Sequence, residues 1–371
     1  MWSDVMFGRG GKVGPDGGEC LRTFETLEAP AHLGVDLGHP DCRLSRVVGE
    51  RNSEVGDAWT GAGEAVREAI AQAMTRTGII DYPTGIASLD SFTGGLHAGE
   101  VTILAARPGM GKSVGALTVA RANAMRGLGV AVFSLEMTKD ALSLRMACDV
   151  AYSRGEIVFN GASANPTFDK AMKGELEGSQ WRRLRDANED IDRWPLLIDD
   201  RAGLTMAQIE GAARRAIRKW QRAGIKPGPV IIDHLGKVRP SNDRRGNKHA
   251  EVADVSNDCQ AMAKRLGVPV LALVQLNRAV ENREGHEPQL SDLRQAGELE
   301  EDARQVMFLY RPEYYLREPA KDETFEERAA RLDKLQDCKN QCFWLVEKNS
   351  HGPRGQVKAF SEIACSAFRD W

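Results

Sequence analysis

The stretch that most constrains this chain of 371 residues is Val-Thr-Ile-Leu-Ala-Ala-Arg-Pro-Gly-Met-Gly-Lys-Ser at 101–113. The apolar run 101–104 has the composition of a buried strand, and a loop with two glycines leads from it into a helical stretch, 114–125. Because glycine has no side chain, backbone N–H groups can turn inward around a polyphosphate, and the positive end of the helix points at the same anion. The order strand, loop and helix therefore predicts a phosphate-binding P-loop in an α/β fold.

Two side chains of this loop carry its chemistry. Lys112 would reach the β- and γ-phosphates of a nucleotide, and the hydroxyl of Ser113 would hold Mg²⁺. The residues expected to bind the nucleotide are Arg107, Pro108, Gly109, Met110, Gly111, Lys112, Ser113 and Val114. One position departs from the pattern G-x-x-x-x-G-K-[ST], because Ala106 stands where its first glycine would be.

Each of three other apolar runs is followed by a polar residue: Glu136, Asp233 and Gln275. Ligands of open α/β sheets bind at the carboxyl ends of parallel strands, so these side chains are expected beside the P-loop. Asp233 is placed to bind Mg²⁺ directly or through water. The amide of Gln275 is placed to sense the γ-phosphate or to orient water. An apolar run that ends in an acid is commonplace, but two such strands beside one P-loop are not.

Composition narrows the class of protein. Hydrophobic residues make up 42% of the chain, which is ample for a core, yet no apolar run reaches the roughly 20 residues of a membrane span. The first residues lack the basic and apolar regions of a secretory signal. Of seven scattered cysteines only Cys338 and Cys342 are close, so we expect reduced thiols in a cytoplasmic protein and no zinc site.

The formal net charge of −3 gives no overall signal for nucleic acid, so any such binding must come from local basic loops. One loop, 236–249, contains Arg239, Arg244 and Arg245 with a single acid, Asp243. A solvated surface loop is the plainer interpretation, because most runs of charge are that. The alternative is a loop that contacts the phosphates of a nucleic acid.

The chain is expected to divide into three parts. Residues 1–60 are rich in glycine without a sustained period, and we predict an irregular segment. Residues 61–78 contain a helix, since apolar residues recur at helical spacing over 63–74. Residues 79–371 would form one large α/β domain. Its patterns predict helices at 138–152, 168–187, 204–222 and 251–266, strands at 101–104, 129–135, 195–198, 229–233, 268–274, 305–310, 342–347 and 356–360, and helical character at 318–340.

Several motifs together resemble one family. In chain order they are Pro-Thr-Gly at 83–85, Leu-Asp at 89–90, Gly-Gly-Leu at 94–96, the P-loop at 105–113, Phe-Ser-Leu-Glu-Met at 133–137 and Ile-Ile-Asp-His-Leu at 231–235. The most specific are Gln-Leu-Asn-Arg-Ala-Val-Glu-Asn-Arg at 275–283, Pro-Gln-Leu-Ser-Asp-Leu-Arg-Gln-Ala-Gly at 288–297 and Glu-Glu-Asp-Ala at 300–303. This ordered series over residues 62–362 resembles the C-terminal motor domain of DnaB-type replicative helicases, a RecA-like hexameric family.

The resemblance implies a RecA-like P-loop NTPase fold, with a central, mostly parallel sheet flanked by helices. It also implies a motor that uses ATP and Mg²⁺ to move along single-stranded DNA as a ring and to unwind the duplex at a replication fork. Glu136 would polarise the attacking water, Asp233 would support the metal, and Gln275 would couple the γ-phosphate to the following loop.

The same resemblance assigns contacts beyond the nucleotide. Arg294, Gln295 and Gly297 match the loop that contacts the single-strand backbone inside the ring. The helix at 63–74 matches the linker helix, which docks on the neighbouring subunit of the homo-oligomer. A primase or a loader is implied as a further partner.

Two features depart from the family's pattern. The family has a helical collar domain before the linker helix, where this chain has about 60 glycine-rich residues. The family also ends a late strand with Lys-x-Arg-x-Gly, whose arginine reaches into the neighbour's ATP site. Here Lys348 is kept, but Ser350 stands at the arginine position and Arg354 follows four residues on. An arginine finger contributes a factor of about 10³–10⁵ in rate, so this substitution bears on turnover.

Two other functions stay open at this stage. One is a protein that binds ATP and DNA, or joins another helicase's ring, with poor hydrolysis, because loss of a finger costs rate rather than nucleotide affinity. The other is a different RecA-like ATPase, such as a recombinase or a clock-type regulator. The P-loop, Glu136 and Asp233 suit it equally, but the stretches 275–283 and 291–297 argue against it.

Overall fold

The computed structural model describes residues 60–74, 80–154, 164–241, 248–283, 285–317, 319 and 323–371. The chain divides into two compact units between Thr77 and Gly78. In the first unit the helix α2 (Ala62–Met74) is described, and its bounds match the predicted helix within one residue. The expected irregular segment 1–60 lies outside the described residues, apart from Thr60.

The described part of the second unit is built on one sheet of nine strands, in the order β3-β2-β4-β5-β1-β6-β7-β8-β9. The strands are β1 (Val101–Ala106), β2 (Gly129–Ser134), β3 (Leu196–Asp199), β4 (Pro227–Asp233), β5 (Val270–Gln275), β6 (Gln305–Tyr310), β7 (Gln341–Asn349), β8 (Gly355–Glu362) and β9 (Ala367–Asp370). The first six strands of this order pair in parallel, and β6 to β9 pair antiparallel. The prediction of an α/β fold with a mostly parallel sheet is confirmed.

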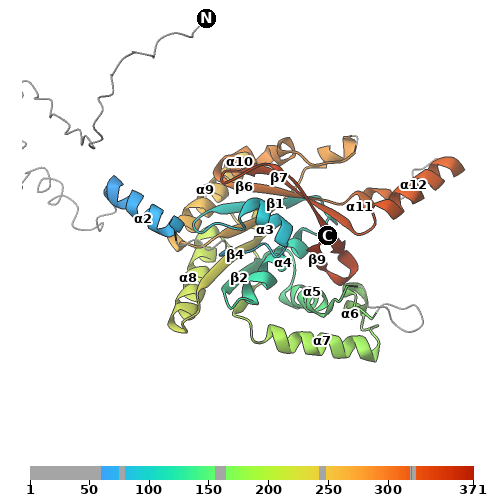
Figure 1. The fold of residues 1–371 in the computed structure, drawn as a ribbon, viewed down its shortest axis with the longest axis horizontal. Helices are drawn as coiled ribbons and strands as arrows, with labels where there is room; N and C mark the ends of the chain where they lie inside the picture. The colour runs from blue at the N-terminus through green and yellow to red at the C-terminus, as the bar shows by residue number, and fades with distance from the viewer. Residues whose placement is uncertain are drawn as a thin grey trace, which may run out of the picture. The chain divides into compact units, whose positions relative to one another are not determined.

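Helices cover both faces of this sheet (Figure 1). The described helices of this unit are α3 (Ala87–Thr93), α4 (Lys112–Ala124), α5 (Lys139–Ala151), α6 (Phe168–Lys173), α7 (Gly178–Ile191), α8 (Met206–Arg222), α9 (Lys248–Leu266), α10 (Gly297–Asp302), α11 (Pro312–Leu316) and α12 (Phe325–Asp337). Successive residues of β1 enter different cores: Ile103 packs with α8 and α9, and Leu104 packs with α4. Burial on both faces is why the strands appear in the sequence as unbroken apolar runs.

The structure corrects one predicted helix and adds elements that the patterns did not indicate. The helix predicted at 168–187 is two helices, because Gly174 has a φ of 75° after α6 and a capping box of Glu177 and Gln180 begins α7. The short elements α3, α11 and β9 were not predicted. Helix α12 extends beyond the outline of the sheet (Figure 1), and none of its residues is buried. Among the described helices, none has the length and apolar character needed to cross a membrane.

Candidate functional site

The turn between β1 and α4 is shaped by two glycines. Gly109 has a φ of 82° and Gly111 a φ of 98°, in the left-handed region that other residues rarely adopt. A Cβ atom on Gly109 would lie 2.6 Å from the ring of Tyr314, and one on Gly111 would lie 2.8 Å from the side chain of Ile363. Ala106, by contrast, is the last residue of β1 and has the extended backbone of a strand. The motif therefore tolerates alanine at its first position without strain.

Lys112 and Ser113, the first residues of α4, converge on Asp233 at the end of β4. The Nζ of Lys112 lies 3.6 Å from Oδ1 of Asp233, and the Ser113 hydroxyl donates to Oδ2 at 2.5 Å. Asp233 is only 2% exposed, and its Oδ1 accepts no hydrogen bond from the described residues. A buried carboxylate oxygen next to a hydroxyl is the donor set that Mg²⁺ prefers, so these residues fit the predicted metal.

Burial shifts the pKa values of two side chains close to Asp233, those of Lys112 and His234. It lowers the pKa of Lys112, and the nearby carboxylates of Asp233 and Glu136 oppose that shift. Burial also lowers the pKa of His234, with the charge of Lys112 as the next cause. The Nε2 of His234 lies 3.5 Å from Oε2 of Glu136, whose side chain is 49% exposed at the end of β2. At neutral pH the imidazole is therefore neutral beside a solvent-accessible carboxylate.

A cavity of about 350 Å³ opens along the P-loop. Lys112, Ser113, Glu136 and Gln275 all line it, so the structure brings together the residues expected at the ends of separate strands. Gln275 pairs in register with Ala106, beside the start of the loop. It also lines a neighbouring cavity of about 420 Å³, which the segment after β5 encloses. Gln275 thus stands between the phosphate site and that segment.

Arg107 lines the cavity and also holds the P-loop against the segment after β5. It forms an ion pair with Glu281 and donates to the carbonyl of Leu276 at 2.8 Å. Met110 is 1% exposed, and its N–H donates to the carbonyl of Arg107 at 3.2 Å. Its side chain packs in the core. The other expected nucleotide contacts, Pro108, Gly109, Gly111 and Val114, line the cavity.

Lys348 does not line this cavity. It lies near the end of β7 and donates to the carbonyl of Glu300 at 2.6 Å. Ser350 follows it in the turn between β7 and β8, where its N–H donates to the carbonyl of Arg304. Arg354 is exposed in the same turn and makes no ion pair or side-chain hydrogen bond with the described residues. Of Lys348 and Arg354, it is Arg354 whose side chain has no hydrogen-bond or ion-pair partner among the described residues.

The predicted DNA contacts are described only in part. Arg239 is exposed after β4, and its N–H donates to the carbonyl of Leu204 at 2.9 Å. Arg244 and Arg245 lie outside the described residues. The backbone of Arg294 and Gln295 lies in a 3₁₀ helix, Leu290–Ala296, and Gly297 begins α10, but the two side chains are not described. These assignments stay predictions.

Sequence patterns missed one cation at the site. Arg145 of α5 lines the P-loop cavity, where its guanidinium lies 3.9 Å from the centre of the Phe168 ring. It donates to the Ser366 hydroxyl at 3.4 Å and makes no ion pair with a described carboxylate. An arginine on a helix resembles any solvated surface residue in the sequence. Only the packing of α5 beside the P-loop identifies it.

Comparison with known proteins agrees with this geometry. Residues 81–370 match the family described as the DnaB-like helicase C-terminal domain. The chain belongs to this family. The motif series in the sequence had predicted that membership, which is thereby confirmed.

Relatives within the DnaB-like family share both sequence and fold. The chain is 33% identical over 290 residues to the replicative DNA helicase DnaC of Bacillus subtilis (strain 168), covering 78% of this chain and 56% of that protein. It therefore spans little more than half the length of this relative. It is also similar to the structure of the ATPase domain of G40P, with a TM-score of 0.70 and 28% identity over 84% of this chain and 99% of that chain.

A second solved structure, of a DnaB-like replicative helicase and its interactions with primase, is 27% identical to this DnaB-like chain. It has a TM-score of 0.67 and covers 89% of this chain and 71% of that one. Together with the G40P domain, it confirms that the sheet and its helices have the RecA-like arrangement predicted for the domain.

Proposed function

We propose that this chain is the ATP-driven motor of a replicative DNA helicase, which moves along single-stranded DNA and unwinds the duplex at a fork. The observation that carries the proposal is one cavity lined by Lys112, Ser113, Glu136 and Gln275, with Asp233 buried against Lys112 and Ser113, in a chain of the DnaB-like family. A DNA fork in a bacterial or phage-infected cell implies a cytoplasmic protein.

The residues divide the chemistry of phosphoryl transfer among themselves. Lys112 binds the β- and γ-phosphates, while Ser113 and Asp233 hold Mg²⁺, which when bound neutralises charge on the transferred group. Glu136, at the mouth of the cavity, polarises the attacking water. His234, whose Nε2 lies 3.5 Å from Oε2 of Glu136, would help to position that carboxylate for this task.

Gln275 links hydrolysis to movement in this proposal. Its position between the phosphate cavity and the segment after β5 supports a coupling role, because a change at the γ-phosphate would be felt by the loop that carries Arg294 and Gln295. Those residues, with Gly297 and the basic loop at Arg239, Arg244 and Arg245, would hold the phosphates of single-stranded DNA. Such binding is largely independent of sequence and weakens as salt rises.

The proposed assembly is a homo-oligomeric ring, of six subunits by analogy with the family, with ATP between neighbours. Arg354, in the turn after β7, would face the ATP of the next subunit, and Lys348, near the end of β7, would support that turn. A primase or a loader is a further partner in this proposal; the primase interactions named for one similar structure support the former.

The test is strand separation on a forked duplex with ATP and Mg²⁺. Lys112→Ala should lower ATP turnover at least about 100-fold and abolish strand separation, because it removes charge stabilisation of the γ-phosphoryl group. Lys219→Ala, at an exposed lysine of α8, is the matched control and should act as wild type. Equal activity of wild type and Lys112→Ala would rule the proposal out.

One observation favours a second candidate, a protein that binds ATP and DNA but hydrolyses slowly. Ser350 occupies the position of the family's arginine, and its backbone is fixed to Arg304 in the turn. Under this candidate wild-type turnover is slow and rises when an arginine is supplied. The two candidates differ in the role of Arg354.

A further inference from the structure

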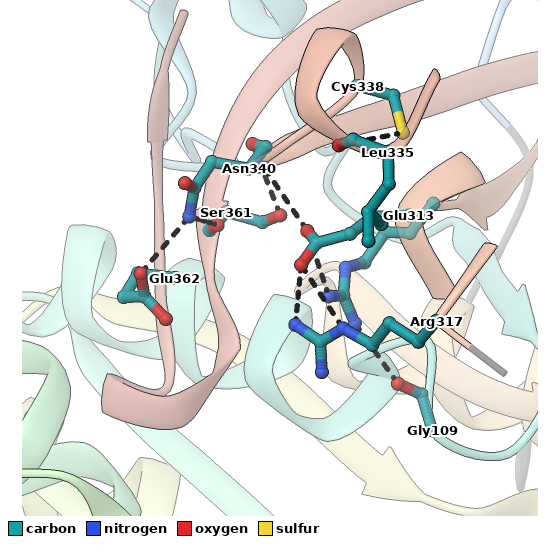
Figure 2. Close-up of polar contacts among 9 residues, drawn as sticks. Gly109, Glu313, Arg317, Leu335, Cys338, Asn340, Ser361 and Glu362 are labelled. Atoms are coloured by element: carbon teal, nitrogen blue, oxygen red, sulfur yellow. Dashed lines mark hydrogen bonds and ion pairs between the residues drawn. The ribbon is translucent and has the colours of Figure 1, made fainter. Parts of the chain in front are cut away.

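The carbonyl of Gly109 faces away from the cavity side of the P-loop and meets a buried arginine. Arg311, the residue after β6, donates from Nη1 to this carbonyl at 3.3 Å. Figure 2 labels Gly109 and draws the hydrogen bond to its carbonyl oxygen as a dashed line. Arg311 is only 2% exposed, which makes it one of the largest fully buried side chains described. A buried guanidinium at the back of a phosphate loop requires an explanation, because arginine is rarely buried without a specific partner.

The charge of Arg311 is balanced by Glu313 on α11. Its Nη2 lies 3.6 Å from Oε2 of that carboxylate, and Glu313 is 8% exposed. Glu313 is itself fixed, because Arg317 donates to Oε1 at 2.5 Å and the N–H of Asn340 donates to Oε2 at 3.1 Å (Figure 2). Burial opposes the charged carboxylate, but these hydrogen bonds outweigh it and keep the pKa of Glu313 below its ordinary value.

Asn340, which donates to Glu313, is itself fixed by hydrogen bonds to β8. Asn340 precedes β7 with a φ of 61°, and its Nδ2 donates to the carbonyl of Ser361 at 2.7 Å and to Glu362 at 3.1 Å. The N–H of Ser361 returns a bond to the Asn340 carbonyl at 2.7 Å. Arg311 is therefore linked to the antiparallel part of the sheet through Glu313 and Asn340, which Figure 2 labels, although Nε of Arg311 has no hydrogen-bond partner among the described residues.

Arg311 is not placed to contact a nucleotide directly. It does not line the P-loop cavity, and its side chain is closed off from solvent. Tyr314, one turn further on α11, covers the loop closely enough that a Cβ on Gly109 would lie 2.6 Å from its ring. Both residues thus act on the outer side of the loop, whose inner side carries the phosphate-binding N–H groups.

We propose that Arg311 is a positioning residue for the nucleotide site: by binding the Gly109 carbonyl, it fixes the P-loop in the form that receives the phosphates. A loop whose N–H groups turn inward must turn a carbonyl outward, and an outward carbonyl without a partner costs free energy. A guanidinium anchored by Glu313 supplies that partner before the nucleotide arrives. Preorganisation of this kind raises affinity by reducing the ordering that binding would otherwise require.

This inference rests on the proposed function, since it assumes that the P-loop binds a nucleotide. The experiment is titration of the full chain with a fluorescent ADP analogue and Mg²⁺, beside thermal unfolding of each variant. Arg311→Met removes the donor but leaves Glu313 paired with Arg317 and Asn340. We expect its Kd to rise about tenfold, the scale of one charge-assisted hydrogen bond. Arg311→Lys keeps a charged donor and should recover part of that loss.

The chain offers a matched control in Arg331. Its guanidinium pairs with Glu323 at 2.6 Å and donates to the carbonyl of Leu316 at 2.8 Å, so it repeats the chemistry of Arg311 without touching the P-loop. Arg331→Met should lower thermal stability and leave the Kd unchanged. The inference is overturned if Arg311→Met and Arg331→Met both bind as wild type does.

The variant Lys112→Ala distinguishes a failure of this inference from a failure of the proposed function on which it rests. If that variant binds the analogue as tightly as wild type, the nucleotide site itself is wrong and the proposed function fails. If Lys112→Ala loses affinity while Arg311→Met does not, only the role of Arg311 is wrong. Should Arg311→Met fail to fold, Arg311→Lys carries the comparison, and an unchanged Kd there contradicts the proposal.

Discussion

Asp233 joins the two chemical halves of the nucleotide site. One of its oxygens accepts from Ser113 and the other faces Lys112, so the metal-binding hydroxyl and the phosphate-binding ammonium meet on one buried carboxylate. The sequence predicted this meeting because each residue stands at the carboxyl end of a strand or the start of a helix. It could not predict Arg145 or Arg311, because an isolated arginine has no pattern until packing places it beside the loop.

The substitution at Ser350 leads to a prediction about Arg354. Since Arg354 has no partner among the described residues and lies in the same turn, we expect it to act on the ATP of a neighbouring subunit. Arg354→Ala should then lower DNA-stimulated ATP turnover about 1,000-fold, the low end of what an arginine finger contributes. Ser350→Arg placed in the Arg354→Ala chain should restore part of it.

The same measurement decides between the two proposed functions. If wild-type turnover is slow and Ser350→Arg alone raises it, the protein is the poorly hydrolysing candidate and Arg354 is not a finger. A brisk wild-type rate that Arg354→Ala leaves unchanged would contradict the role of Arg354 as well. Nucleotide affinity should stay near the wild-type value in all these variants, because a finger acts on rate.

Among the elements, those that are long and apolar were predictable and those that depend on one contact were not. The buried parallel strands appear in the sequence as unbroken apolar runs, and their observed ends lie within a few residues of the predicted ones. The break between α6 and α7 depends on Gly174 and on a capping box. Neither is evident from the residue pattern over 168–187, which predicted a single helix. Strand β9 is four residues long and is defined by its pairing with β8, which no local pattern indicates.

The contact between α8 and β2 gives a prediction about stability. A Cβ atom on Gly129 would lie 2.3 Å from the ring of Trp220, which is 4% exposed between the helix and the sheet. Gly129→Ala should therefore lower the free energy of unfolding by about 1–3 kcal/mol, the usual cost of overpacking a core. Chemical denaturation monitored by circular dichroism measures it.

Gly211 on the same helix is the control for that substitution. Its Cβ would meet only the end of the Arg215 side chain at 3.6 Å, and alanine favours helix by up to about 1 kcal/mol over glycine. Gly211→Ala should leave stability unchanged or raise it. A Gly129→Ala protein as stable as Gly211→Ala would mean that Trp220 does not pack against β2 as described.

At the scale of the whole molecule, the parallel and antiparallel halves of the sheet place their candidate functional side chains at different positions. In the parallel half, Glu136 and Gln275 line the P-loop cavity from the ends of two strands, and Asp233 at the end of β4 contacts Lys112 and Ser113. In the antiparallel half, Lys348 lies near the end of β7 and Arg354 lies in the turn between β7 and β8, and neither lines that cavity. This division suits a site completed by a neighbouring copy. The sequence could predict it only through family resemblance, because composition carries no information on assembly.

The helix α2 provides the test of assembly. It has an apolar stripe in which Val66 is 56%, Ile70 54% and Met74 82% exposed, an arrangement that favours burial against another surface. If that surface belongs to a neighbouring subunit, Ile70→Glu should lower the mass of the assembly measured by light scattering after size-exclusion chromatography, because a charge would be buried in the contact. Ala71→Glu introduces the same charge away from the stripe and should leave the mass unchanged. Equal masses for the two variants would show that α2 does not hold subunits together.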